Sequence, residues 1–246
     1  MTDPYIQSDS AGTIVFDADL APQVGHDWFV PEAWAKAGCL RSRGGGRGAV
    51  SFVDTPAGAC VLRHFHRGGM VATILGDRYL WNGREKTRSF AEFRLLSSMR
   101  KAGLPVPQPV AARYVRSGLY YTADLMTRRI DHACTLAQSL EQGHLDSTLA
   151  RNTGMLIARF HRHGIWHADL NAHNILVSRN TLYIIDFDRG EMRAPAASWQ
   201  QANLQRLRRS LVKLGAAADG ETRFEHRIWS PLLQGYESPS EKELRE

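Results

Sequence analysis

Apolar residues in the first half of the chain are spaced mostly as in β-strands. Short apolar runs bounded by turn residues predict five strands, at residues 14–16, 50–53, 59–65, 110–115 and 119–125. Helical spacing predicts a short helix at residues 27–36 and a longer one at residues 87–103, with Gly103 as a C-terminal stop. This half of the chain therefore predicts a sheet built around one long helix.

Helical spacing dominates the second half of the chain. A helix is predicted at residues 145–164, and the part from about residue 199 onward is helical and rich in arginine. Between these helices, strands at residues 175–177 and 182–185 flank a turn at residues 178–180 and form a small hairpin. This half therefore predicts helices around one small hairpin.

The order of these elements predicts an α+β fold of two lobes with a cleft between them. The N-lobe is expected to be strand-rich and to cover residues 1–126, and the C-lobe to be compact, helical and to cover residues 127–246. Three prolines in residues 104–109 exclude a helix or a central strand there, because each proline removes a backbone donor.

The composition is that of a soluble globular protein, with 43% hydrophobic and 23% charged residues. No apolar run approaches the roughly 18 residues that a membrane-spanning helix needs. The polar N-terminus lacks the order of a signal peptide, and the three cysteines are too widely spaced for a metal or disulfide pattern. We expect a protein of the reduced cytoplasmic compartment.

The net charge of +6 indicates an anionic partner but does not identify its class. Nucleic acid, an anionic membrane surface and a negatively charged substrate all fit a basic balance. The tryptophans Trp28, Trp34 and Trp81 are not surrounded by a single-strand-binding pattern, so we expect no nucleic acid partner. The choice between membrane and substrate depends on the chemistry of the site.

The strongest chemical pattern lies at the small hairpin of the second half. His167 and Asp169 form a His-x-Asp pair, Asn174 follows five positions after that aspartate, and two apolar strands then lead to Asp186. Phosphoryl transfer explains this set, because the phosphates need metal ions held by oxygen ligands. We assign Asn174 and Asp186 as Mg²⁺ ligands, since Mg²⁺ prefers hard oxygens and takes few from the protein. Asp169 is left as the base for the acceptor hydroxyl.

This segment resembles the catalytic loop and the metal-binding Asp-Phe-Gly triplet of the protein-kinase-like superfamily, with Asp188 in place of the glycine. The resemblance implies ATP and Mg²⁺ as cofactors and Glu92 as the helix carboxylate. From their position at the end of a strand between the lobes, we expect Asp124 and Met126 at the hinge, with backbone groups near the adenine. A phosphate-covering loop is implied at Gly44, Gly45, Gly46, Arg47 and Gly48.

The superfamily pattern has a lysine on the third strand, where this chain has Arg63. Arginine is larger than lysine and carries a forked group, so the two are not equivalent on phosphates. Two interpretations follow, an arginine that grips the phosphates of ATP or a degraded pseudokinase that only binds nucleotide. The intact Asp169, Asn174 and Asp186 favour the arginine that grips phosphates.

Further segments resemble the lipopolysaccharide core heptose/Kdo kinase family, in which Leu62-Arg63 followed by Arg67-Gly68-Gly69 is normal. This resemblance implies transfer of phosphate from ATP to the 4-hydroxyl of the Kdo (3-deoxy-D-manno-octulosonic acid) sugar of Kdo-lipid IVA. It also implies a peripheral place at the cytoplasmic face of a Gram-negative inner membrane. The matching segments are residues 44–48, 61–69, 167–176, 185–190 and 203–211.

The acceptor is the least determined part of the prediction. The part after Asp186 is short and lacks Ala-Pro-Glu, which disfavours a protein acceptor, and no protein partner is identified. A soluble small-molecule phosphotransferase of the same superfamily is the alternative. Leucines and arginines alternate over residues 204–214 as in a helix that lies on an anionic membrane, but we favour leucines packed in the C-lobe core.

Overall fold

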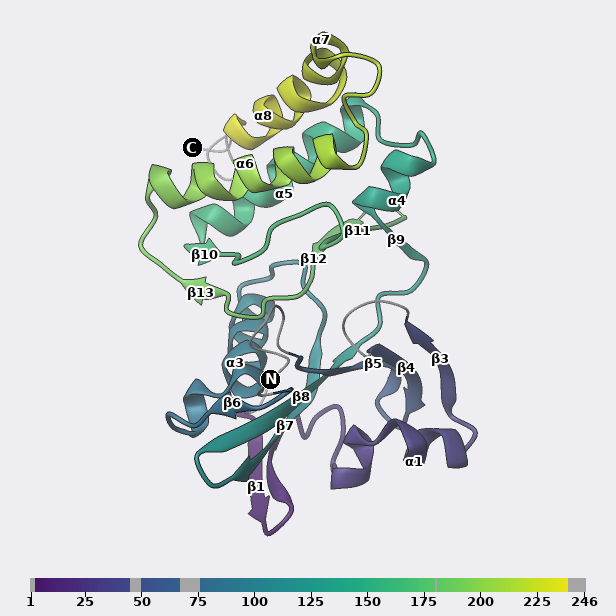
Figure 1. Cartoon of the computed structure of the whole chain (residues 1–246), viewed down its shortest axis with the longest axis vertical. Helices are drawn as coiled ribbons and strands as arrows, with labels where there is room; N and C mark the ends of the chain where they lie inside the picture. The colour runs from purple at the N-terminus through teal and green to yellow at the C-terminus, as the bar shows by residue number, and fades with distance from the viewer. Residues whose placement is uncertain (1–2, 45–49, 67–75, 180, 239–246) are drawn as a thin grey trace. The chain divides into compact units, whose positions relative to one another are not determined.

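The computed structural model describes residues 3–44, 50–66, 76–179 and 181–238, and the chain divides into two compact units (Figure 1). Unit 1 comprises Met1–Ala102 and Pro107–Arg129, and unit 2 comprises Gly103–Val106 and Ile130–Glu246. The proline-rich segment at residues 104–109 is divided between the units. Pro105 lies in unit 2, where its carbonyl accepts from the Ile184 N–H at 3.2 Å, and Pro107 and Pro109 lie in unit 1. Pro109 is the first residue of a central strand, so the expected exclusion of such a strand holds only for residues 104–108.

Unit 1 is built on an antiparallel sheet with the strand order β1-β2-β7-β8-β5-β4-β3, and the short β6 pairs with β8. All five strands predicted in this half are present. The strands are β1 (Tyr5–Asp9), β2 (Gly12–Phe16), β3 (Leu40–Gly44), β4 (Val50–Thr55), β5 (Gly58–His64), β6 (Tyr79–Leu80), β7 (Pro109–Ser117) and β8 (Tyr120–Arg128).

Three strands of unit 1 were not predicted, and each lacks an apolar alternation. β1 and β3 stand at the two ends of the strand order, with the polar sequences Tyr-Ile-Gln-Ser-Asp and Leu-Arg-Ser-Arg-Gly, and β6 has two residues. Edge strands in natural proteins are often polar and short, because this prevents pairing with other chains. Such strands therefore give little signal in the sequence.

Helix α3 (Arg88–Lys101) contacts β7 and β8, and it confirms the long helix predicted for the first half. Its side chains Phe90, Phe93, Leu96 and Met99 are buried in unit 1. The shorter predicted helix is divided into a 3-10 turn, η1 (His26–Phe29), and α1 (Pro31–Lys36). The division falls at Val30, whose extended backbone is what the following proline favours.

Unit 2 is mainly helical, as predicted. Its sheets are small, with β11 (Ile175–Ser178) between β12 (Thr181–Ile184) and β9 (Ala133–Thr135), and β10 (Ile165–Trp166) paired with β13 (Glu191–Met192). The helices are α4 (Leu136–Glu141), α5 (Ser147–Arg162), α6 (Ala197–Lys213), α7 (Glu221–Phe224), the π-helical turn η3 (Glu225–Trp229) and α8 (Ser230–Glu237).

Helices α5 and α8 pack closely at two glycines. A Cβ atom at Gly154 would lie 1.9 Å from the Leu232 carbonyl oxygen, and one at Gly235 would lie 2.0 Å from the Arg151 carbonyl oxygen. At the same helix pair, the Nδ1 atom of His161 lies 2.9 Å from the Tyr236 hydroxyl. Burial lowers the pKa of His161 to about 4, so its imidazole is neutral at pH 7.

Candidate active site

The segment after β10 is fixed by His167, whose side chain is buried. The Asp169 N–H donates to Nδ1 of His167 at 3.0 Å, so Nδ1 is an acceptor and the ring proton lies on Nε2. The Nε2–H then donates to the Ile185 carbonyl at 3.0 Å. His167 therefore links the loop that carries Asp169 to the residue that precedes Asp186.

Burial lowers the pKa of His167, which keeps the ring neutral and suits one donor and one acceptor nitrogen. Hydrogen bonds at both ring nitrogens leave none for a proton transfer to a substrate. His167 is thus a structural residue of the loop.

Asn174 lies at the end of the same loop, and a hydrogen bond from its side-chain amide orients it. Its Nδ2 donates to the Asp169 carbonyl at 2.9 Å, and its backbone carbonyl accepts from the Ile185 N–H at 3.0 Å. The amide nitrogen is used inside the loop, which leaves Oδ1 as the atom of this side chain that can bind a cation.

Asp186 stands directly after the hairpin strand β12 and Ile185, and its side chain is exposed. Its backbone has a φ of +62°, in the left-handed region that residues with a Cβ rarely adopt. The next residue, Phe187, is 1% exposed, and its ring lies 4.8 Å from the His167 ring and 5.8 Å from the Phe160 ring. The buried phenyl ring anchors the backbone that holds the Asp186 carboxylate.

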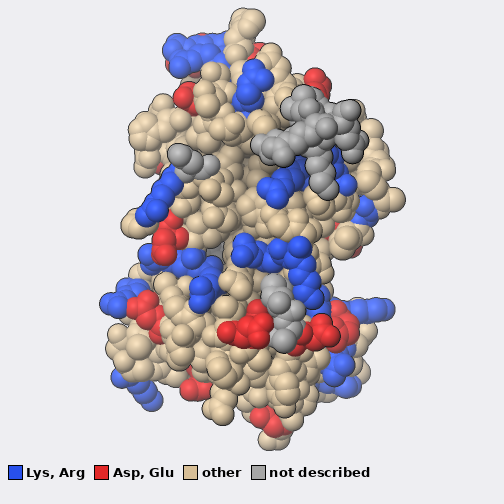
Figure 2. All heavy atoms as spheres, turned by 180° about the vertical axis from the view of Figure 1, so that it is seen from behind, with Lys and Arg blue, Asp and Glu red and all other residues tan. Residues whose placement is uncertain are grey.

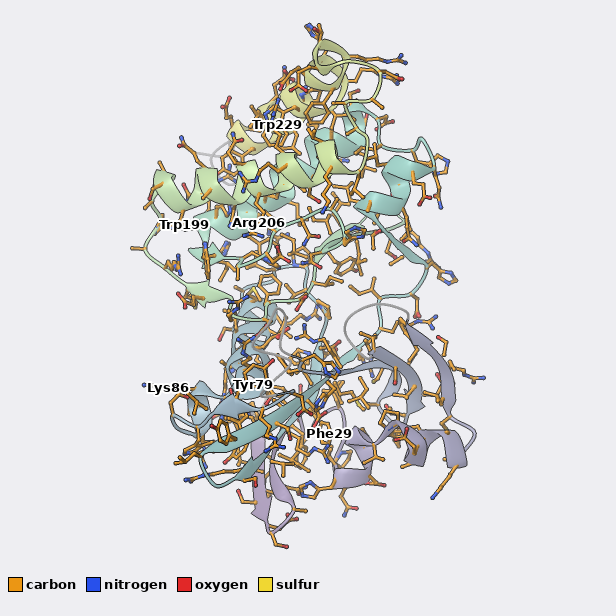
Figure 3. The ribbon with its side chains drawn as sticks, viewed as in Figure 1. Phe29, Tyr79, Lys86, Trp199, Arg206 and Trp229 are labelled. Carbon is orange, nitrogen blue, oxygen red and sulfur yellow. The ribbon has the colours of Figure 1, made fainter. Side chains whose placement is uncertain are left out.

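Helix α6 presents three side chains to this loop at helical spacing. Asn203 is buried and clasps the His167 backbone, accepting from its N–H at 3.3 Å and donating to its carbonyl at 2.9 Å. One turn further, the Arg206 guanidinium donates to Asp169 Oδ1 at 2.6 Å, and Figure 3 marks its place on α6. A further turn along, the Ser210 hydroxyl accepts from the Ala172 N–H at 3.1 Å.

Arg206 is the functional candidate that the sequence reasoning missed. It was treated only as one of the basic residues of an amphipathic helix. The spacing of Asn203, Arg206 and Ser210, three and then four residues apart, puts them on one helix face and was a usable signal.

The leucines of α6 are packed inside unit 2, which confirms the interpretation favoured for this helix. Leu204, Leu207 and Leu211 are buried, and Arg208 pairs with Glu221 and Glu225. Among the residues that the structure describes, no helix is long and apolar enough to cross a membrane.

In unit 1, Arg63 of β5 and Glu92 of α3 form an ion pair. The Glu92 carboxylate is buried, and the Arg63 guanidinium also lies over the Phe65 ring, with its carbon 4.5 Å from the ring centroid. Arg63 thus has the carboxylate partner that the superfamily pattern gives to a lysine.

Asp124 differs from the sequence prediction in its position. It was expected with Met126 at a strand end, but β8 continues to Arg128, so both residues lie inside the strand and are buried. The Asp124 carboxylate accepts from Arg113 Nε at 2.9 Å and from His64 Nδ1 at 2.7 Å. The aspartate therefore joins three strands, and its assignment and that of Met126 to nucleotide binding stay predictions.

His64 lies between two carboxylates. Its Nδ1 bonds Asp124, and its Nε2 lies 2.7 Å from Asp77 Oδ2. Because both nitrogens must donate to carboxylates, this geometry requires the imidazolium form. The hydrogen bond that His64 donates to Asp124 accordingly raises the pKa of His64.

The predicted glycine-rich loop lies almost wholly outside the described residues. Gly44 is the last residue of β3, while Gly45, Gly46, Arg47 and Gly48 are not described, and Arg67, Gly68 and Gly69 are not described either. In the described ranges, no three His, Cys, Asp or Glu side chains converge as a cation site. On the face drawn in Figure 2, Lys and Arg side chains occur on both units.

Most of the chain matches one family of known proteins. A model of the lipopolysaccharide kinase (Kdo/WaaP) family matches residues 31–236. A relative named 3-deoxy-D-manno-octulosonic acid kinase, from Stenotrophomonas maltophilia strain R551-3, is 49% identical over 214 residues, which are 86% of this chain and 84% of the relative. A relative of the same name from Xanthomonas oryzae pv. oryzae strain PXO99A is 46% identical over 219 residues, covering 89% and 87%.

A solved structure, WaaP in complex with acyl carrier protein, superimposes with a TM-score of 0.52 over 86% of this chain and 85% of that chain. The sequence identity is 17%, so this likeness concerns the fold alone. Together with the family match, it confirms the predicted α+β fold of the protein-kinase-like type.

Proposed function

Because the chain belongs to the lipopolysaccharide kinase (Kdo/WaaP) family, we propose that it transfers phosphate from ATP to the 4-hydroxyl of the Kdo sugar of Kdo-lipid IVA. Kinase activity in lipopolysaccharide core biosynthesis follows from the family and its relatives. The choice of acceptor and hydroxyl is the specific content of the proposal.

One observation supports the assignment of the site. The catalytic loop and the segment that ends at Asp186 are joined by hydrogen bonds. The Ile185 backbone bonds both His167 and Asn174, and the Asp169 carbonyl accepts from Asn174. The backbone segments that carry Asp169, Asn174 and Asp186 are thereby joined in one network of hydrogen bonds. Such preorganisation is how enzymes lower the cost of aligning reacting groups.

Asn174 Oδ1 and the Asp186 carboxylate would hold Mg²⁺. Both are hard oxygen donors, and the Asn174 amide nitrogen is already bonded within the loop. When bound with ATP, the metal ion neutralises charge on the transferring phosphate. The left-handed backbone at Asp186 and the buried Phe187 ring support this role, because strained backbone is retained where function needs it.

Asp169 accepts the proton of the attacking hydroxyl, and Arg206 positions it. More than half of the Asp169 side chain is exposed, so an acceptor can reach the carboxylate. A guanidinium N–H of Arg206 donates to one carboxylate oxygen and orients it, and the other oxygen is available to the acceptor. A geometry fixed in this way favours a direct proton transfer.

Arg63 holds the phosphates of ATP, with Glu92 as its partner. The buried Glu92 carboxylate fixes the guanidinium, and the forked group can bind phosphate oxygens in pairs. An intact pair favours an active enzyme over a nucleotide-binding pseudokinase, because a degraded site has no reason to keep a buried carboxylate matched to its cation.

Two observations support a Kdo-containing lipid as the acceptor. The relatives are named as Kdo kinases, and the chain has a net positive charge. A lipid-linked sugar that carries phosphates and a carboxylate attracts arginine and lysine. Such an acceptor lies in a membrane, so the protein works as a peripheral enzyme at the cytoplasmic face of the inner membrane of a Gram-negative bacterium.

The test is an assay of phosphate transfer from labelled ATP to Kdo-lipid IVA, with the phosphorylated position mapped by NMR. We expect one phosphate at the 4-hydroxyl. Transfer to soluble alcohols or aminoglycosides but not to Kdo-lipid IVA would favour the soluble phosphotransferase. Binding of Mg²⁺-ATP without transfer to any acceptor would favour the pseudokinase.

A further inference from the structure

Two of the most exposed large apolar side chains in unit 1 lie next to each other. Leu80 is 60% exposed and Leu119 is 72% exposed. Leu80 pairs across the sheet with Tyr120, and the Trp81 N–H donates to the Leu119 carbonyl at 2.9 Å. Figure 1 shows β6 alongside β8, so both leucines stand at one end of this sheet.

Trp81, the residue that follows Leu80, packs against two other aromatic rings. The Trp81 ring lies 5.0 Å from the Tyr114 ring and 6.1 Å from the Tyr121 ring, measured between centroids. The Arg116 guanidinium covers the Trp81 ring at 4.8 Å, and its Nε donates to the Gly118 carbonyl at 3.0 Å. The ring contacts of Trp81 and the hydrogen bond to Gly118 fix the backbone next to both leucines. The two leucine side chains are therefore exposed in the folded state of unit 1.

Leu119 is part of the two-residue turn between β7 and β8, at Gly118 and Leu119, where Gly118 has a φ of +60°. A hairpin turn projects from a sheet and does not form a groove. An apolar tip of this kind suits insertion between lipid headgroups, whereas a helix of a partner protein needs a concave surface.

Basic residues are frequent in the sequence around Leu80. Residues 78–88 contain four of them, Arg78, Arg84, Lys86 and Arg88, against the single acidic residue Glu85. Glu85 is within 3.3 Å of both Arg84 and Arg94, and the other acidic side chain close in sequence, Asp77, is paired with His64. Figure 3 shows Lys86 pointing away from the sheet.

We propose that this surface, the hairpin tip formed by Leu80, Trp81, Leu119 and Tyr120 with the basic residues Lys86 and Arg116, docks unit 1 on an anionic lipid membrane. The leucines enter the headgroup region, and the aromatic rings lie at its level, where Trp and Tyr are favoured. Each basic side chain adds attraction to anionic headgroups. The inference deepens the proposed membrane contact, and it rests on the proposed function only for the claim that the acceptor is membrane-borne.

The rival membrane surface in this chain is α6. Its central leucines are buried, and only Val212 and Leu214 at its end are exposed, at 37% and 40%. These two residues supply a control, because replacing them removes exposed apolar side chains from another part of the chain.

The experiment is flotation of the full-length protein with vesicles of phosphatidylcholine alone or with phosphatidylglycerol added, without ATP or acceptor. The wild type should bind the anionic vesicles. The double variant Leu80→Ser/Leu119→Ser should bind them at least tenfold more weakly, Lys86→Ala should bind them about fivefold more weakly, and Val212→Ser/Leu214→Ser should bind like the wild type. Unchanged thermal unfolding shows that the variants are folded.

Equal binding of the wild type and the Leu80→Ser/Leu119→Ser variant would overturn the hairpin tip as the docking surface. No binding of the wild type to anionic vesicles would overturn the membrane contact itself. The kinase assay on detergent-dispersed Kdo-lipid IVA needs no vesicle, so a failure of the proposed reaction is seen there independently.

Discussion

At the scale of single residues, Asp169 is the most tightly positioned side chain of the site that is also open to solvent. Its backbone is tied to His167, Asn171 and Asn174, and its carboxylate is bonded by Arg206. The backbone hydrogen bonds fix the position of the Asp169 main chain, and the contact with Arg206 fixes the orientation of the carboxylate. Loss of the arginine should therefore affect the chemical step more than the binding of ATP.

For Arg206→Ala we expect kcat for phosphate transfer to fall about 10- to 100-fold, because a misplaced catalytic group costs rate without unfolding the site. The KM for ATP should stay nearly unchanged. Steady-state kinetics with Kdo-lipid IVA measures both. Arg209→Ala, an exposed arginine on the same helix, is the control. An unchanged kcat in Arg206→Ala would remove the positioning role.

His161 makes stability depend on pH, through its burial between α5 and α8. Its pKa is about 4 in the folded protein against an ordinary value of 6.5, so the unfolded chain binds more protons between these values. The stabilisation is complete above the ordinary pKa and is lost as pH falls towards the folded one. From about pH 7.5 to about pH 5, the wild type should lose about 2 kcal/mol of unfolding free energy relative to His161→Gln.

Urea denaturation of both proteins at the two pH values measures this difference. Subtracting the variant removes the contributions of His64 and His167, which titrate in both proteins. A difference that stays constant with pH would show that His161 is not held neutral by burial.

At the scale of elements, α6 is the support of the catalytic loop. One face of the helix packs its leucines into unit 2, and another carries Asn203, Arg206 and Ser210 to the loop. The loop has no regular structure between β10 and β11, so its backbone groups need side-chain partners. A helix that is itself part of the core can supply them without moving.

Asn203→Ala should lower the free energy of unfolding by about 3 kcal/mol, because it leaves the buried N–H and carbonyl of His167 without partners. Gln205→Ala, on the exposed side of α6, should change it by less than about 0.5 kcal/mol. Thermal or urea denaturation compares the two. Equal stability of both variants would mean that water replaces the amide and that α6 does not support the loop.

The sequence predicted those parts of the site that are local in the chain. The His-x-Asp pair, Asn174 and Asp186 fall within 20 residues, and the hairpin between them fixes their order in space. Arg206 was missed because its partner is 37 positions away, and a basic residue on a helix usually faces solvent. Asp124 was misplaced because an apolar run does not show how far a paired strand extends beyond it.

At the scale of the whole molecule, each of the two units holds its own set of predicted site residues by contacts within that unit. Unit 1 contributes Arg63 with its partner Glu92, and unit 2 contributes Asp169, Asn174 and Asp186. No group in either set depends on the other unit for its hydrogen bonds described above. The predicted division of the chain into an ATP-covering lobe at residues 1–126 and a catalytic lobe at residues 127–246 stays a prediction.

The measurement that tests the central claim most directly is phosphate transfer from labelled ATP to Kdo-lipid IVA by the wild type and by Asp169→Asn. The asparagine keeps an oxygen for Arg206 but is no base, so it isolates the proton transfer. We predict transfer by the wild type, at least about 100-fold slower transfer by the variant, and similar ATP binding by both. Transfer by Asp169→Asn at the wild-type rate would contradict the account.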